Sequence, residues 1–490
     1  MSLGQRASDD WPKKPWPARR RPAGRRPASA SLTRVAPRGR TTKSPRLMRQ
    51  APSEIGQMRA WLQRVLLAAL LTHSLPAMVL ADVAADDYRF PIQDRWVATV
   101  VGTPSQFTAE LTPAERIPFR KRRLRIFEDR ELPEVIFYNR DMLYTVALQK
   151  EKSAPVMFII AGTGAAHNGS KNMLLARAYY EMGYNVIALS SPTYANFISS
   201  ASSTGVPGHV FHDAEDLYRA MQKAWDAVKG KRTASSFSMT GYSLGGFNAA
   251  FVSQLDSQQK VFDFDKVLLI NPPVNLYNSI SLLDRMIENI PGGTENYDQF
   301  FERIIEVFTD VYKRNKDTVS FDEDFLARVF LAYNPRDEEL AALVGLAFRL
   351  ASSSLILTSD VMTDFGFIKP QGYEIPRHAN LTPYRQVAGR IGFTDFYHDF
   401  FYPFYAEEHP DLSRDGFIAL MSLNSITSYL RDAEHIQVVH NADDIILAPG
   451  EIDYIKDVFG TRAKIYPYGG HLGNMAYRDV IAHIKSVTRP

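Results

Sequence analysis

The sequence of 490 residues contains no cysteine, so it can form no disulfide and has no cysteine for lipoprotein attachment. It also has no Walker-type phosphate loop. The run Gly162-Thr163-Gly164 lacks the third glycine that a dinucleotide-binding fingerprint needs at its fixed offset. We therefore expect no nucleotide cofactor, and no other cofactor is predicted.

Acidic residues are scarce at the N-terminus. Residues 1–57 carry 14 Lys and Arg against 3 Asp and Glu, whereas residues 82–490 have a net charge of −10. The acidic remainder gives no reason to expect nucleic-acid binding. The first 57 residues are rich in Pro, Arg and Ser, which predicts a disordered extension, translated from an upstream start codon. A basic arm for nucleic acid or acidic lipid is the alternative.

The apolar run near the N-terminus is too short for a comfortable bilayer span, because polar residues and a proline interrupt it from residue 72 onward. Residues 58–81 combine a basic start, the apolar run 65–71 and the small-residue sequence Val79-Leu80-Ala81, which is typical of a secretory signal peptide. We expect export with cleavage after Ala81, and an uncleaved inner-membrane anchor or a buried helix are the alternatives. An exported chain without cysteine fits a bacterial periplasm.

Strand and helix patterns alternate in two separate parts of the chain. Strands are predicted at 155–160, 185–189, 235–240, 266–271, 435–441 and 463–467, and helices at 213–228 and 451–459. This alternation predicts an α/β fold with a mostly parallel sheet. Before it, 96–101, 134–138 and 142–148 are predicted as antiparallel edge strands.

Helical patterns replace the alternation between residues 276 and 430. They cover 280–290, 297–313, 322–331 and 338–354, and the aromatic-rich stretch 360–405 is expected to be irregular. We therefore divide the chain into a first core part (82–275), a mainly helical cap insertion (276–430) and a C-terminal core part (431–490). Eight aromatic residues lie between Phe393 and Tyr405; they either pack the cap or line a pocket for a bulky apolar substrate.

The most informative motif is Gly241-Tyr242-Ser243-Leu244-Gly245, which follows a predicted strand and opens a predicted helix. A serine on so tight a turn takes a strained backbone conformation and needs small neighbours, and the helix N-terminus faces its hydroxyl. Such a serine needs an imidazole as base and a carboxylate to orient it. Downstream, a strand ends at the carboxylates Asp443 and Asp444, and a glycine loop after the next strand carries His471.

An oxyanion hole is the remaining requirement. The glycine-containing loop after the strand at 155–160 lets backbone N–H groups approach an oxyanion. We expect one donor from Leu244 and a second from Thr163 or Gly164; a plain strand–loop turn is the alternative. His167 in this loop either contacts substrate or stabilises the loop, and Tyr242 is a further candidate for substrate contact.

Over residues 130–490 the chain resembles the α/β-hydrolase superfamily, through the Gly241–Gly246 turn, Asn441-Ala442-Asp443-Asp444 and Gly469-Gly470-His471. The resemblance implies Ser243 as nucleophile and His471 as base, and it favours Asp443 over Asp444 as the orienting acid. The oxyanion loop departs from the superfamily pattern, because it contains Ala-Gly-Thr-Gly where many members have His-Gly.

These features predict a serine hydrolase that cleaves an ester, thioester or amide in a small-molecule or lipid-like substrate with a bulky apolar part. A catalytically silent hydrolase-like binding or scaffolding protein of the cell envelope is the alternative. The oligomeric state does not follow from the sequence.

Two further patterns have simpler explanations. His209 and His212 have a metal-like spacing, but Asp213 is explained as the N-cap of the following helix, so no metal site is predicted. The basic run 120–125 predicts either contact with an anionic membrane surface or an ordinary solvated surface.

Overall fold

The computed structural model describes residues 88–315, 329–330 and 332–490. The predicted extension (1–57), the predicted signal peptide (58–81) and most of the helix predicted at 322–331 lie outside these residues. The strands are β1 (Arg120–Leu124), β2 (Met142–Ala147), β3 (Ser153–Ile160), β4 (Asn185–Leu189), β5 (Thr233–Tyr242), β6 (Lys266–Ile270), β7 (Ile436–Asn441) and β8 (Ala463–Tyr466).

These strands form one sheet in the order β1-β2-β4-β3-β5-β6-β7-β8. Strands β1, β2 and β4 pair antiparallel, and all pairs from β4 to β8 are parallel. The carboxyl ends of β3, β5 and β6 lie side by side, because Ile160 pairs with Gly241 and Tyr242 pairs with Ile270. The loops that leave these ends therefore meet at one edge of the sheet, where α/β proteins bind their ligands.

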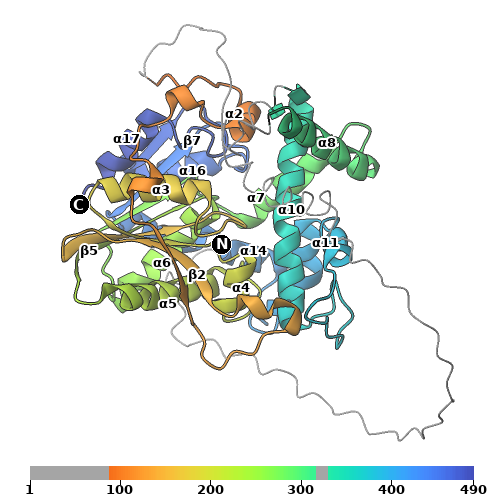
Figure 1. Cartoon of the computed structure of the whole chain (residues 1–490), viewed down its shortest axis with the longest axis horizontal. Coiled ribbons are helices and arrows are strands. Elements are labelled where there is room, and N and C mark those ends of the chain that lie inside the picture. The colour runs from red at the N-terminus through yellow and green to blue at the C-terminus, as the bar shows by residue number, and fades with distance from the viewer. Residues whose placement is uncertain (1–87, 316–328, 331) are drawn as a thin grey trace, which may run out of the picture.

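Helices cover both faces of the sheet (Figure 1). Alternate residues of β3 point to opposite faces: Val156 and Phe158 pack with α5 and α6, whereas Met157 and Ile159 pack with α3 and α17. Because both faces are covered, β3 and β4 are almost continuously apolar. The core helices are α2 (Arg95–Val101), α3 (Ser170–Glu181), α4 (Ala195–Ser200), α5 (Val210–Lys229), α6 (Leu244–Gln259), α16 (Glu451–Phe459) and α17 (Arg478–Val487), with 3-10 turns η1 (Ser105–Phe107), η2 (Ala114–Arg116), η3 (Glu134–Asn139) and η8 (Gly460–Arg462).

A mainly helical insertion separates β6 from β7 and lies to one side of the sheet (Figure 1). Its α-helices are α7 (Leu276–Arg285), α8 (Tyr297–Asn315), α10 (Asp337–Thr363), α11 (Thr382–Ala388), α12 (Phe393–Phe396), α13 (Tyr402–Tyr405), α14 (Arg414–Leu420) and α15 (Thr427–Asp432). Shorter turns are η4 (Met286–Asn289), η5 (Thr294–Asn296), the π-helical η6 (Tyr397–Phe401) and η7 (Leu423–Ile426). The predicted fold class, a mostly parallel sheet flanked by helices with a large helical insertion, is confirmed.

Helix α10 is long and apolar enough to cross a membrane by length and composition alone, with a mean hydropathy of 1.9. Two thirds of its most apolar window is nevertheless buried inside the protein, against α2, α4, α7 and α11. A helix that is apolar on most sides is expected where neighbours surround it. Its composition therefore fits a core helix that joins the insertion to the sheet domain.

Four local predictions differ from the structure. Residues 96–101 are helical, because Asp94 caps α2 by accepting the Val97 N–H at 2.7 Å. Residues 134–138 belong to the 3-10 turn η3, and much of 360–405 is helical. Helix α5 begins at Val210, so Asp213 is not its N-cap; the Asp213 carboxylate instead accepts the Gly208 N–H at 2.8 Å from within the first turn.

The basic run predicted as a surface segment forms β1, the exposed edge strand of the sheet. Lysine and arginine on an edge strand disfavour pairing with a strand from another molecule. This gives the run a structural role, and contact with an anionic membrane surface stays a prediction.

Candidate active site

The turn between β5 and α6 holds Ser243 in a strained conformation, with φ of +53° and ψ of −127°. The residues two positions before and after it have no room for a side chain. A Cβ on Gly241 would lie 2.2 Å from the Gly245 carbonyl oxygen, and a Cβ on Gly245 would lie 2.2 Å from the Ile160 carbonyl oxygen. The motif therefore forms the sharp strand–turn–helix that the sequence predicts, and the close packing of β3 against the turn explains its glycines.

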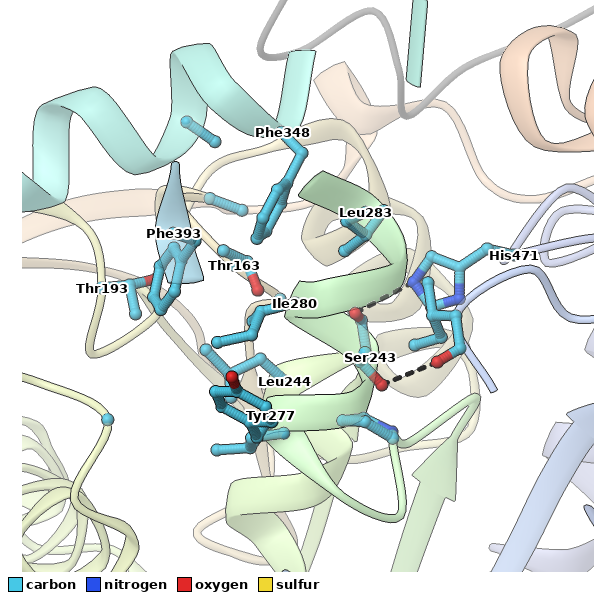
Figure 2. Close-up of a pocket in the computed structure, with 18 of the residues that line it drawn as sticks. Thr163, Thr193, Ser243, Leu244, Tyr277, Ile280, Leu283, Phe348, Phe393 and His471 are labelled. Carbon is cyan, nitrogen blue, oxygen red and sulfur yellow. Dashed lines mark hydrogen bonds between the residues drawn. The ribbon is translucent and has the colours of Figure 1, made fainter. Parts of the chain in front are cut away.

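His471 lies opposite this serine. Its Nε2 is 3.0 Å from Ser243 Oγ, a contact that Figure 2 marks with a dashed line. The His471 backbone N–H donates to Thr99 Oγ1 of α2 at 2.9 Å, so a helix from the N-terminal part of the chain positions the loop. The following residue, Leu472, has a φ of +64°, which indicates a tight turn.

The carboxylate that faces His471 belongs to Asp444. Both of its oxygens lie 3.0 Å from His471 Nδ1, and one of them accepts the Asn271 side-chain amide at 2.8 Å. Burial alone would raise the pKa of Asp444, but the opposing His471 and the hydrogen bonds hold it below its usual range. The carboxylate is therefore ionised near neutral pH and fixes a proton on Nδ1, which leaves Nε2 to accept a proton from Ser243.

The prediction of Asp443 as the orienting acid is wrong. Its carboxylate accepts the backbone N–H groups of Gly470 at 2.9 Å and Gly469 at 3.2 Å, and it makes no contact with the His471 ring. Burial raises the pKa of Asp443. The two neighbouring side chains leave the turn in different directions, so one orients the imidazole and the other holds the loop that carries it.

One of the three predicted oxyanion donors is already engaged, because the Gly164 N–H donates to Thr193 Oγ1 at 2.8 Å. Thr163 and Leu244 line the cavity beside Ser243 (Figure 2). Within the described part of the chain, the backbone N–H groups of these two residues donate to no other group. They are the remaining candidate donors, and Thr193 is a supporting residue that the sequence did not indicate.

His167 does not contact the cavity, so its predicted role in substrate binding is wrong. Its ring is buried, with Nδ1 2.6 Å from Thr145 Oγ1, and its backbone N–H donates to Ser190 Oγ at 2.8 Å. Burial, with a smaller effect from Lys121, lowers its pKa to about 4. Tyr242 lines the cavity but is almost wholly buried, and its ring packs closely against Gly162.

A cavity of about 200 Å³ opens beside Ser243 and His471. The sheet domain and the insertion share its wall, and the insertion contributes mostly apolar side chains, several of which Figure 2 shows around the two polar residues. They include Tyr277, Ile280, Leu283, Val344, Phe348 and Phe393. Helix α10, which the hydropathy pattern marked only as helical, supplies part of this wall.

The aromatic residues at 393–405 fulfil both predicted roles: some line the cavity and others pack the core. Phe393, Tyr397 and Phe401 line the cavity, whereas Phe396 and Phe400 are fully buried in the core. The lining residues are spaced four apart, so they share one face of consecutive helical turns. This spacing was present in the sequence and would have separated the two groups.

No family model and no curated protein matches this sequence. Similar solved structures include an esterase from Pyrococcus furiosus, with 9% identity, a TM-score of 0.35 and coverage of 78% of this chain and 96% of that one. The 2-hydroxy-6-oxo-6-phenylhexa-2,4-dienoate hydrolase of Rhodococcus sp. strain RHA1 has 13% identity and a TM-score of 0.37, covering 76% of this chain and 100% of that one. A thioesterase domain from the curacin biosynthetic pathway has 12% identity and a TM-score of 0.34, covering 75% and 98%.

Likeness at these values says nothing about substrate or activity. The fold follows instead from the strand order, from the antiparallel β2 at the start of an otherwise parallel sheet, and from the sharp turn at Ser243 between β5 and α6. On these features the chain has the fold of the α/β-hydrolase superfamily.

Proposed function

We propose that this protein is a serine hydrolase that cleaves a carboxylic ester, thioester or amide bearing a bulky apolar group, with an ester the best candidate. The observation that carries the proposal is the line of hydrogen bonds from Ser243 Oγ through His471 to Asp444 at the wall of an apolar cavity. A nucleophile, a base and an orienting acid in mutual contact are the parts that acyl transfer requires.

The proposed reaction has two halves. Ser243 Oγ attacks the carbonyl carbon of the substrate while His471 Nε2 takes the hydroxyl proton, and the N–H groups of Leu244 and Thr163 stabilise the resulting oxyanion. Collapse of this intermediate breaks the bond to the leaving group, which receives the proton from His471. Water then attacks the acyl-enzyme with the same base, and the carboxylic acid leaves with Ser243 regenerated.

A fluorophosphonate probe tests whether Ser243 is an activated nucleophile. The probe should label the wild-type chain and fail to label Ser243→Ala. Ser279→Ala is a matched control, because Ser279 also lines the cavity but donates its hydroxyl to the Ile446 carbonyl instead of an imidazole. Equal labelling of wild type and Ser243→Ala would mean that another residue reacts with the probe and would contradict Ser243 as the nucleophile. No labelling of the wild type would favour the inactive binding protein.

We also propose that the chain is exported and acts in a bacterial periplasm. The support is the signal-like composition of residues 58–81 together with the absence of cysteine. N-terminal sequencing of protein purified from its native host should give Asp82-Val83-Ala84. Native protein that still carries residues 1–57 would contradict the export proposal.

A further inference from the structure

Three histidines and a glutamate converge at a second place, where the sheet domain meets the insertion. His209 is the N-cap residue of α5 and His212 lies in its first turn, whereas Glu408 and His409 follow α13, about 200 positions later in the chain. His209 Nε2 lies 2.8 Å from His409 Nε2, and His212 Nε2 lies 2.9 Å from Glu408 Oε2. The candidate ligand atoms of His209, His212 and Glu408 all lie within 4.8 Å of one another.

The group is shielded from solvent. His209 is fully buried, His212 and His409 are less than 10% exposed, and the Glu408 side chain is 13% exposed. The Tyr405 ring packs beside His209 and His212, with centroids 4.8 and 5.8 Å away. Burying three imidazoles and a carboxylate together costs desolvation free energy, whereas apolar side chains would fill the same space without that cost. Packing alone therefore does not explain this group.

We propose that His209, His212, His409 and Glu408 bind a zinc ion. Imidazole nitrogens and a carboxylate oxygen are ordinary zinc ligands, and four protein ligands without an open position are the pattern of a structural site. A tetrahedral ion with bonds of about 2.0–2.1 Å holds its ligand atoms about 3.4 Å apart. The contacts of His209 with His409 and of His212 with Glu408 would each open by roughly half an ångström. His409 is not one of the residues whose ligand atoms converge within 4.8 Å, so its ring would also move toward His212 and Glu408 to complete the tetrahedron.

The position of the proposed zinc site indicates a structural role. None of the four residues lines the cavity, but Pro207 and Gly208, directly before His209, do. Phe401 also lines the cavity, and its ring lies 3.0 Å from the place where a Cβ on Gly208 would stand. A zinc ion that joins α5 to the segment after α13 would fix the insertion to the sheet domain and hold this wall of the cavity in place.

The metal-like spacing of His209 and His212 has a different local setting from the one that the sequence predicts. Asp213 is not the helix N-cap, because α5 begins at Val210. His209 is then the N-cap residue and His212 lies in the first turn, and residues that are distant in the sequence complete the set. Only the tertiary fold brings Glu408 and His409 to them.

The test uses the full chain, and its readouts do not depend on activity. Elemental analysis of purified protein should find about one zinc per chain. Removal of the metal with a chelator should lower the Tm by several degrees, and addition of Zn²⁺ alone should restore it, since an ion that binds only the folded state stabilises it. Absence of zinc together with no change of Tm on addition of Zn²⁺ would overturn the proposal.

Glu408→Gln is the informative variant, because the amide keeps the shape of the side chain and a hydrogen bond to His212 but removes the anionic ligand. It should fold with the Tm of the metal-free wild type, bind zinc at least tenfold more weakly and lose most of the response to Zn²⁺. His378→Gln alters an exposed histidine outside the site and should respond as the wild type does. An unchanged zinc response in Glu408→Gln would contradict its role as a ligand, and the chelation experiment on wild type decides the proposal if the variant does not fold.

Discussion

Asp443 and Asp444 are adjacent in sequence but face different groups, the loop amides and the His471 ring respectively. Asp444→Asn should lower kcat by about 10⁴-fold, because an amide in that place stabilises the wrong imidazole tautomer. Asp443→Asn should cost less than about tenfold, since its amide oxygen can still accept one loop N–H. Steady-state kinetics on the two variants measure the difference. The reverse order of effects would restore Asp443 as the orienting acid.

A second residue-scale prediction concerns acid stability and His167. Its pKa is about 4 in the folded protein against 6.5 for a free histidine, because the ring is buried. Between these values the unfolded chain binds a proton at this site and the folded chain does not, so stability falls as the pH falls from 6.5 to 4. The loss from this group amounts to about 3 kcal/mol at pH 4.

Urea unfolding of wild type and His167→Gln between pH 7 and pH 4 would measure this contribution. The variant should be less stable at pH 7, because it disturbs the contact with Thr145, but its stability should fall less steeply with acid. Parallel curves for the two proteins would mean that His167 is protonated in the folded state as readily as in the unfolded state.

At the scale of elements, the contact between β3 and the start of α6 constrains the turn at Ser243. Gly245→Ala would place a Cβ 2.2 Å from the Ile160 carbonyl oxygen, so the strand and helix must separate. We expect a loss of about 3 kcal/mol in the free energy of unfolding, because backbone cannot move aside as a flexible side chain can. Activity should fall with it, since the same shift moves Ser243 away from His471.

Gly416→Ala supplies the matched comparison, because it makes the same change within a helix, where the new Cβ meets only side-chain atoms at ordinary distances, Ser413 Oγ at 3.4 Å and Leu412 Cδ2 at 3.5 Å. It should leave stability unchanged or raise it by up to about 1 kcal/mol through helix propensity. Chemical denaturation of both variants measures the contrast. Equal effects at the two positions would show that the turn tolerates a side chain.

The sequence was most informative where a pattern repeats within one element. The buried strands β3, β4 and β6 and the helix after Ser243 follow from their apolar runs and the glycine motif. The strand predicted at 96–101 was wrong because one capping contact decides the local structure. The Asp94 carboxylate accepts the Val97 N–H and stabilises the helix α2 in a run rich in β-branched residues. The choice between Asp443 and Asp444 failed for a related reason, because side-chain direction within a turn depends on the loop packed against it.

For the molecule as a whole, the insertion and the sheet domain share the cavity, so the size of the acceptable apolar group depends on how they fit together. Each methylene buried from water contributes about 0.8 kcal/mol, or about fourfold in kcat/KM. Across esters of rising acyl length, kcat/KM should therefore increase about fourfold per carbon and then level off when the cavity of about 200 Å³ is full. A strict preference for acetyl esters would mean that the cavity does not receive the acyl chain.

The acyl length at which kcat/KM stops increasing should change when a side chain of the cavity wall is shortened. Phe348 lines the cavity from α10 and its ring packs against that of Phe393, with ring centroids 5.6 Å apart. Phe348→Ala should shift the preferred acyl group to longer chains and lower kcat/KM for short ones, because the larger cavity leaves short chains with fewer contacts. Tyr373→Ala removes an exposed aromatic side chain of the same insertion and should leave the acyl-length profile unchanged. An identical profile in both variants would place the acyl group outside this cavity, whereas a shift in Phe348→Ala alone would identify α10 as the element that limits its length.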